Sequence, residues 1–216
     1  MRRILILSGL LALPALAFAN SLSFEGSLDP TNPNDVFLVS FNLASKGTVL
    51  FQSYGYGGTS SANVAGTNAA GLVIPGGGFD SYLSLFQGIG NSATFLASND
   101  DGSCPRGTPD PVCADSTLTE TGLAAGNYTL AITLPFNFSF AENYGSGTLG
   151  DGFIGLQSSY YDAASNEVRT SNYALDIITG DARLTVVAPE PDTLSLLIAS
   201  LVVAGAMGAF KQSARK

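Results

Sequence analysis

The chain has 216 residues, of which 45% are hydrophobic, only 12% are charged and none is histidine, and its formal net charge is −8. Without histidine, neither a Ser-His-Asp triad nor a Cys-His catalytic pair can form. The negative charge disfavours binding to nucleic acid and to anionic lipid, which are negative themselves.

Residues 1–19 have the features of a secretory signal peptide. Two arginines begin it, an apolar run follows, and Ala17 and Ala19 are the small residues of a cleavage site. The mature chain is therefore predicted to begin at Asn20, after export by the Sec machinery and cleavage by signal peptidase. A transmembrane helix is the alternative, but the apolar run is short and contains Pro14.

Residues 20–188 have the length of one domain and can bury a substantial core. Four basic and 15 acidic residues give this segment a net charge of −11. Such a surface suits calcium-rich surroundings outside the cell, or simply solubility. Gly, Ser, Thr, Asn, Phe and Tyr are abundant and no helical period is sustained, so the segment is predicted to be β-rich.

Alternating apolar and polar residues predict several β-strands. The clearest is at residues 127–134, whose even-numbered positions from 128 onward are all large and apolar. The same phase continues through Phe136, Phe138 and Phe140, so we expect a bend or a sheet edge at Pro135. Further strands are predicted at residues 22–24, 35–43, 47–54, 81–86, 94–98, 173–179 and 182–187. Together these strands predict an all-β fold, an antiparallel β-sandwich or jelly roll.

Two glycine-rich segments separate the predicted strands. Residues 55–78 contain eight glycines and few large side chains, which predicts a mobile insertion or a hairpin on the surface. Residues 144–172 are also irregular, but their aromatic content favours partial packing on the sandwich.

Cys104 and Cys113 are the only cysteines of the chain. In an exported protein an even pair predicts a disulfide, which here would close a small loop and contribute about 2–3 kcal/mol. Their spacing excludes a C-x-x-C redox pair, and two thiolates without histidine make a poor metal site.

Acidic residues around the cysteine loop form a candidate calcium site. Asp100, Asp101 and Asp115, together with Asn99, could place several oxygen ligands around Ca²⁺. Asp80 precedes a predicted strand and could join them if the sheet brings it near. The spacing does not match an EF-hand loop, and a solvated acidic turn is the alternative interpretation. No other cofactor is indicated.

Residues 189–216 form a distinct C-terminal segment. It begins with Pro189, Glu190 and Pro191, continues with the uncharged residues 194–210, and ends in a basic tail. A helix over 194–210 would rise about 25 Å, slightly less than the ~30 Å hydrocarbon core of a bilayer. The basic tail would stay in the cytoplasm and leave the preceding domain outside, as expected of a single transmembrane anchor.

This tail resembles the PEP-CTERM sorting signal of Gram-negative bacteria in the order, spacing and position of its parts. The resemblance implies recognition by an exosortase, a membrane-embedded cysteine protease. The chain would then be anchored transiently in the inner membrane and afterwards released or transferred to the cell surface or the extracellular space. Two departures are Asp192, which adds a second acid before the helix, and a tail rich in lysine rather than arginine.

A second resemblance concerns the exported segment. Its Asp-Val-Phe strand entry, Gly-Gly-Phe-Asp motif, Asn-Asp-Asp-Gly turn and Gly-Asn-Tyr strand occur in the order seen in bacterial pre-peptidase C-terminal domains and related exported β-sandwiches. These motifs lie at residues 35–37, 77–80, 99–102 and 126–128. The resemblance implies a jelly-roll-like sandwich without catalytic residues.

Two functions from different classes remain open, and neither is enzymatic. In the first, the chain is a surface or extracellular-matrix protein, associated with exopolysaccharide or biofilm. In the second, it is a carbohydrate-binding or adhesive module in which tyrosines stack on sugars. The candidate tyrosines are Tyr54, Tyr56, Tyr160 and Tyr161. An aromatic platform that faces solvent would favour the second function, and rings that face inward would favour the first.

Overall fold

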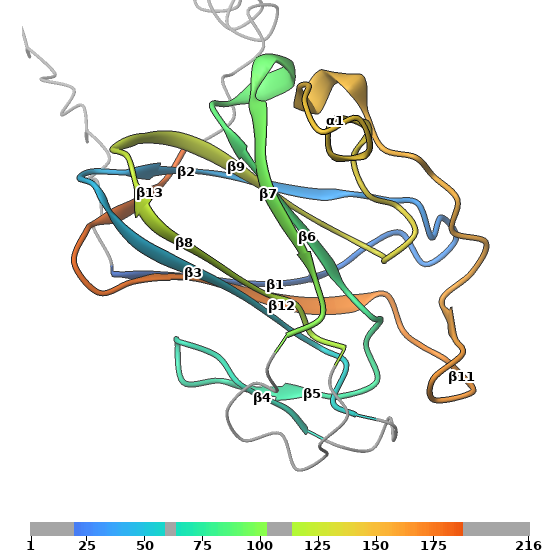
Figure 1. Cartoon of the computed structure of the whole chain (residues 1–216). Helices are drawn as coiled ribbons and strands as arrows, with labels where there is room; N and C mark the ends of the chain where they lie inside the picture. Colours follow the sequence, from blue (N-terminus) through green and yellow to red (C-terminus); the bar gives the residue numbers. More distant parts are fainter. Residues whose placement is uncertain (1–19, 59–63, 103–113, 188–216) are drawn as a thin grey trace, which may run out of the picture. The chain divides into compact units, whose positions relative to one another are not determined.

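The computed structural model describes residues 20–58, 64–102 and 114–187, which form two antiparallel β-sheets packed face to face (Figure 1). One sheet has four strands, in the order β1 (Ser21–Ser27), β12 (Asn172–Thr179), β3 (Gly47–Tyr54) and β8 (Thr117–Leu123). The other has five, in the order β13 (Leu184–Val186), β2 (Phe37–Leu43), β9 (Gly126–Thr133), β6 (Tyr82–Gln87) and β7 (Thr94–Asp100).

Eight of these strands pair as in a jelly roll. β1 pairs with β12, β2 with β9, β3 with β8 and β6 with β7. Of these eight strands, the first in sequence pairs with the last, and each further pair lies between the two strands of the preceding pair in sequence. β13 adds a fifth strand at the edge beside β2. The predicted all-β antiparallel sandwich is confirmed.

The core between the sheets is built from the period-two residues. Tyr128, Leu130 and Ile132 of β9 are almost completely buried and pack with residues such as Phe41 of β2 and Phe51 of β3. Burial of each such side chain contributes roughly 1.5–3 kcal/mol, relative to leaving it exposed. These residues therefore fix which face of each strand points inward.

The outer face of the four-stranded sheet is covered by a hairpin, which lies below β3 and β12 in Figure 1. Its strands are β4 (Val64–Thr67) and β5 (Val73–Pro75). Ala65 and Ile74 of the hairpin pack on Tyr54 and Ala174 of the sheet. Residues 55–78 thus include the surface hairpin that was one of the two predictions for this segment.

Short helical turns cover part of the five-stranded sheet on its outer side. They are η1 (Gly90–Ser92), α1 (Phe140–Asn143) and η2 (Leu149–Asp151). Ala141 and Leu149 pack there with Phe86 and Ala131 of the sheet, and Phe153 lies against the same cluster. Residues 144–172 therefore pack partly on the sandwich, as predicted, and this cover explains why β9 is buried on both faces.

The structure differs from the predicted strands at residues 135–140 and at β8, and the short strands β10 (Tyr161–Asp162) and β11 (Glu167–Val168) were not predicted either. The chain does bend at Pro135, but no strand follows: Phe136 is 62% exposed and Ser139 caps α1 by accepting a hydrogen bond from the Glu142 amide. β8 is not anticipated by the pattern, because Leu118 and Leu123 are its only buried apolar residues. Its remaining residues are polar or glycine, and pairing with β3 holds them in the sheet.

Candidate functional site

Three of the five predicted calcium ligands lie together. The carboxylate oxygens of Asp80, Asp100 and Asp101 lie within 4.8 Å of one another, and we call this group the acidic cluster. Asp80 precedes β6 and Asp100 ends β7, and the register of this hairpin, in which Tyr82 faces Asp100, brings the two ends together. Asp101 has a left-handed backbone, with φ at 58°, which turns the chain away from β7.

The other two predicted ligands support the surrounding loops. Asn99 donates its side-chain amide to the carbonyl oxygens of Asp101, at 2.8 Å, and Thr117, at 2.7 Å, which ties the end of β7 to the start of β8. Asp115 is buried and accepts a hydrogen bond from the backbone amide of Tyr56, at 3.1 Å. Asp115 does not belong to the group of mutually close carboxylates.

Burial and mutual repulsion dominate the electrostatics of the acidic cluster. Burial, reinforced by the charges of Asp100 and Asp101, raises the pKa of Asp80 to about 8. Burial and the charge of Asp101 raise the pKa of Asp100 to about 6, and burial raises that of Asp115 to about 7. The Oδ1 atom of Asp80 is buried without a hydrogen-bond partner among the described residues. The cluster is therefore a place where a proton or a cation relieves repulsion.

We expect the melting temperature to fall as the pH rises from about 4 to about 8. An aspartate in an unfolded chain has a pKa of about 3.9, whereas the pKa values of Asp80, Asp100 and Asp115 are raised in the folded state. Between these values the folded chain binds more protons than the unfolded chain, so stability decreases with rising pH. Scanning calorimetry at constant ionic strength measures the change.

Asp80→Asn is the control for this prediction, because the amide keeps the shape of the side chain but cannot ionise. The variant should show a shallower decline of melting temperature with pH than the wild type. A wild-type melting temperature that rises between about pH 5 and about pH 8 would contradict the prediction.

A second polar network surrounds Arg169, whose side chain is buried. Its guanidinium group lies 4.0 Å from the centre of the Tyr56 ring and donates hydrogen bonds to the carbonyl oxygens of Tyr56 and Gly58. Asp162 accepts a hydrogen bond from the Tyr56 hydroxyl, at 2.6 Å, and forms an ion pair with Arg169, at 3.4 Å. The network anchors the start of the glycine-rich segment to the hairpin of β10 (Tyr161–Asp162) and β11 (Glu167–Val168).

Most of the tyrosines that were candidates for sugar stacking face inward. Tyr54, Tyr56 and Tyr160 are buried, so these three rings do not form the solvent-facing platform that would favour carbohydrate binding. Their hydroxyl groups have internal acceptors: Asp176 for Tyr54, Asp162 for Tyr56 and the Asp29 carbonyl oxygen for Tyr160. Tyr161 is the exception, since it is 47% exposed.

Tyr161 lines a groove next to the acidic cluster. The groove has a volume of about 290 Å³ and also contains the exposed ring of Phe136. Asp80 belongs to both the groove and the acidic cluster. The sequence analysis did not single out Phe136 as a binding residue, although the bend or edge expected at Pro135 was a signal that the alternation stops there.

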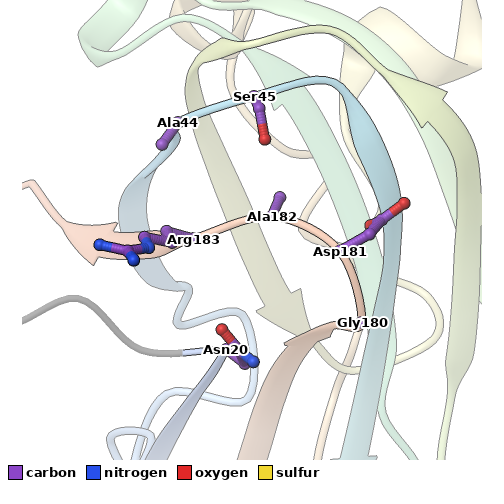
Figure 2. Close-up of a pocket in the computed structure, with 7 residues that line it drawn as sticks. All are labelled: Asn20, Ala44, Ser45, Gly180, Asp181, Ala182 and Arg183. Atoms are coloured by element: carbon purple, nitrogen blue, oxygen red, sulfur yellow. The ribbon is translucent and has the colours of Figure 1, made fainter.

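A further pocket, of about 340 Å³, lies near the start of β1 (Figure 2). Side chains from the β2–β3 and β12–β13 connections surround it, including Ser45, Asp181 and Arg183. Asn20, the predicted first residue of the mature chain, lies at its edge. Among the described residues, no aromatic ring lines this pocket, and Asp181 is the only carboxylate in its lining.

Several predicted residues fall outside the described part of the chain. These are the cleavage-site residues Ala17 and Ala19, the cysteines Cys104 and Cys113, and residues 189–216 with the sorting tripeptide and the apolar run. The corresponding interpretations stay predictions. Within the residues that the structure describes, no helix is long and apolar enough to cross a membrane.

Comparisons with known proteins do not assign the chain to a family. No family model matches it, and no curated protein matches it. Among solved structures, it is similar to a crystal structure of a protein from Sulfurospirillum deleyianum, with 11% sequence identity and a TM-score of 0.35. That match covers 76% of this chain and 99% of the other. Its TM-score is too low to support an argument about fold or function.

Proposed function

We propose that this chain is a non-enzymatic exported protein of the cell surface or extracellular matrix, sorted through Pro189, Glu190 and Pro191. The observation that carries the proposal is the position of the folded domain in the sequence, between the two predicted targeting segments. The strands begin at Ser21, directly after the predicted cleavage site, and end at Val186, shortly before the sorting tripeptide. A self-contained sandwich between two targeting segments fits a cargo domain that is exported and then released, with exopolysaccharide as its surroundings.

The carboxylates of the polar networks support a structural role rather than catalysis. Asp162 accepts hydrogen bonds on both oxygens, from the Ala164 amide and from the hydroxyl groups of Tyr56 and Ser165. Asp176 is likewise bonded on both oxygens. Groups held in this way orient loops and strands and have little capacity left to transfer protons to a substrate.

Changing Pro189, Glu190 and Pro191 together to alanine should stop processing in a host that has the sorting protease. Two prolines around a glutamate give a stiff, extended segment that a membrane protease can read without unwinding a helix. The expected result is accumulation of an unprocessed, membrane-bound form, detected by fractionation and intact-mass analysis. In the wild type, the released form should begin at Asn20.

The matched control is the same host without the sorting protease, in which the wild type and the triple variant should behave alike. If, in the host that has the sorting protease, the triple variant is released at the cleavage position used in the wild type, the two masses will differ only by the three substitutions. That result would contradict the sorting proposal. The tail would then be a plain anchor.

We also propose that the acidic cluster binds Ca²⁺. Calcium prefers oxygen ligands, and three carboxylates from two adjacent strand ends offer part of such a shell, with water completing it. Burial is the main cause of the raised pKa of Asp80, and the cation would remove the repulsion from Asp100 and Asp101 that adds to it. Millimolar calcium above about pH 7 should therefore raise the melting temperature of the wild type but not of Asp100→Asn. If calcium leaves the wild type unchanged, the solvated acidic turn is the correct interpretation.

Carbohydrate binding is the second candidate function, and one observation favours it. Phe136 and Tyr161 expose their rings in the same groove, which the Asp80 side chain also lines. Exposed rings next to hydrogen-bond acceptors are the usual components of a sugar-binding site. The two functions are compatible, because a matrix protein can hold the polysaccharide around it.

A further inference from the structure

The groove of Phe136 and Tyr161 is formed by three separate parts of the chain. Residues 134–136, which follow β9, lie on one side, and residues 160–164 around β10 lie on another. Asp80 comes from the segment that leads into β6. Phe79 and Tyr160 are buried and meet edge to face, with ring centres 6.0 Å apart, so the groove has rigid aromatic walls behind its exposed rings.

The exposed rings are unusual for this protein. Phe136 is 62% and Tyr161 is 47% exposed, although most of the large aromatic side chains of the described residues are buried. The Tyr161 hydroxyl donates a hydrogen bond to Asn166, at 2.9 Å, which holds the ring in place. Fixed, exposed rings in a concave site offer an apolar face to a ligand at little entropic cost.

The polar groups of the groove indicate the chemistry of its ligand. The side chains of Asp80 and Gln157 both line the groove, and each carries an oxygen atom that can accept a hydrogen bond. Of the described residues that line the groove, Arg169 is the only basic one, and its guanidinium group is already bonded to Tyr56, Gly58 and Asp162. Among the residues that the structure describes, the groove therefore offers acceptors to hydroxyl groups but no available cation for an anionic ligand.

We infer that this groove binds a neutral hexose unit of a polysaccharide. The apolar face of the sugar ring lies against Phe136 or Tyr161, and its hydroxyl groups donate hydrogen bonds to Asp80 and Gln157. A volume of about 290 Å³ lies at the small end of ligand pockets, which start at about 300 Å³. The groove thus takes one sugar unit and leaves the rest of the polymer outside. This inference rests on the carbohydrate-binding function proposed above.

Affinity electrophoresis of the full chain tests the inference. The native gels contain soluble neutral polysaccharides built of hexoses, namely hydroxyethyl cellulose, galactomannan or pullulan, and a parallel gel contains the anionic polymer alginate. The wild type should be retarded by at least one neutral polymer and not by alginate. Phe136→Ala and Tyr161→Ala should each bind about 3–10-fold more weakly, the effect of losing one aromatic contact.

Tyr144→Ala is the matched control. Tyr144 is 73% exposed but does not line the groove, so its replacement should leave the retardation unchanged. Melting curves of all variants check that they are folded. Phe136 lies in an exposed turn, so Phe136→Ala tests the groove even if Tyr161→Ala disturbs the β10–β11 hairpin.

The remaining outcomes distinguish a wrong assignment of the binding site from an absence of carbohydrate binding. If a neutral polymer retards the wild type and both groove variants equally, the groove assignment is overturned while carbohydrate binding stands. If no neutral polymer retards the wild type, both are overturned. Retardation by alginate alone would overturn the neutral-sugar assignment. If light scattering instead shows a wild-type dimer that Phe136→Ala dissociates, and no polymer retards the wild type, the face is an interface between copies.

Discussion

Replacing Asp176 with alanine is expected to lower the free energy of unfolding by at least about 3 kcal/mol. The buried carboxylate accepts hydrogen bonds from the hydroxyl groups of Ser23 in β1, at 2.6 Å, and Tyr54 in β3, at 2.8 Å. It also accepts one from the backbone amide of Ala69, at 2.7 Å, in the β4–β5 turn. Hydrogen bonds to charged groups contribute about 1.5–3 kcal/mol each, and alanine would leave these donors without their acceptor.

Urea denaturation followed by fluorescence measures this loss, and a thermal scan should show a melting temperature lower by roughly 6–12 °C. Asp181→Ala is the matched control. Asp181 is exposed and has a single hydrogen bond, from Thr179 at 3.2 Å, so its replacement should cost less than about 1 kcal/mol. A similar small loss for Asp176→Ala would mean that the carboxylate does not join the hairpin to the sheet.

Replacing Gly78 with alanine is expected to cost about 3 kcal/mol, the upper end of the usual penalty for overpacking. A Cβ atom there would lie 2.5 Å from the Asn172 carbonyl oxygen and 2.9 Å from the Gly55 carbonyl oxygen. Both contacts are to backbone, so no side chain can rotate away. The Gly78 amide also donates a hydrogen bond to the Gly55 carbonyl oxygen, at 2.7 Å, which any backbone shift would weaken.

Gly180→Ala is the control for this substitution. No atom lies within 4 Å of a Cβ at position 180, and the backbone there is not left-handed, so alanine should be neutral or slightly stabilising. Urea denaturation of both variants gives the comparison. Equal stability of Gly78→Ala and Gly180→Ala would show that the segments around residues 55, 78 and 172 separate easily.

Much of the sandwich follows from local patterns in the sequence. The strand predicted at residues 47–54 has the same bounds as β3, and β9 buries the alternating residues Tyr128, Leu130 and Ile132. These strands are predictable because a period of two brings large apolar side chains onto one face, whatever the neighbours are. β8 lacks that pattern, and only its pairing with β3 makes it a strand.

In the candidate sites, too, some features are visible in the sequence and others depend on the fold. The adjacent residues Asp100 and Asp101 are visible in the sequence as an acidic turn, but Asp80 joins them only through the register of the β6–β7 hairpin. Register depends on pairing between distant residues, which one sequence does not display. A bend or a sheet edge was expected at Pro135, but the exposure of Phe136 depends on how the chain bends after β9.

The sequence by itself determined the all-β class, most strand positions and the acidic character of the 20–188 segment, because periodicity, composition and charge are local properties. The tertiary structure alone decided which aromatic rings are available to a ligand. Tyr54 and Tyr56 face inward because Asp176 and Asp162, both far away in sequence, accept hydrogen bonds from their hydroxyl groups. A buried tyrosine needs such a partner, and only the folded chain brings the partner within reach.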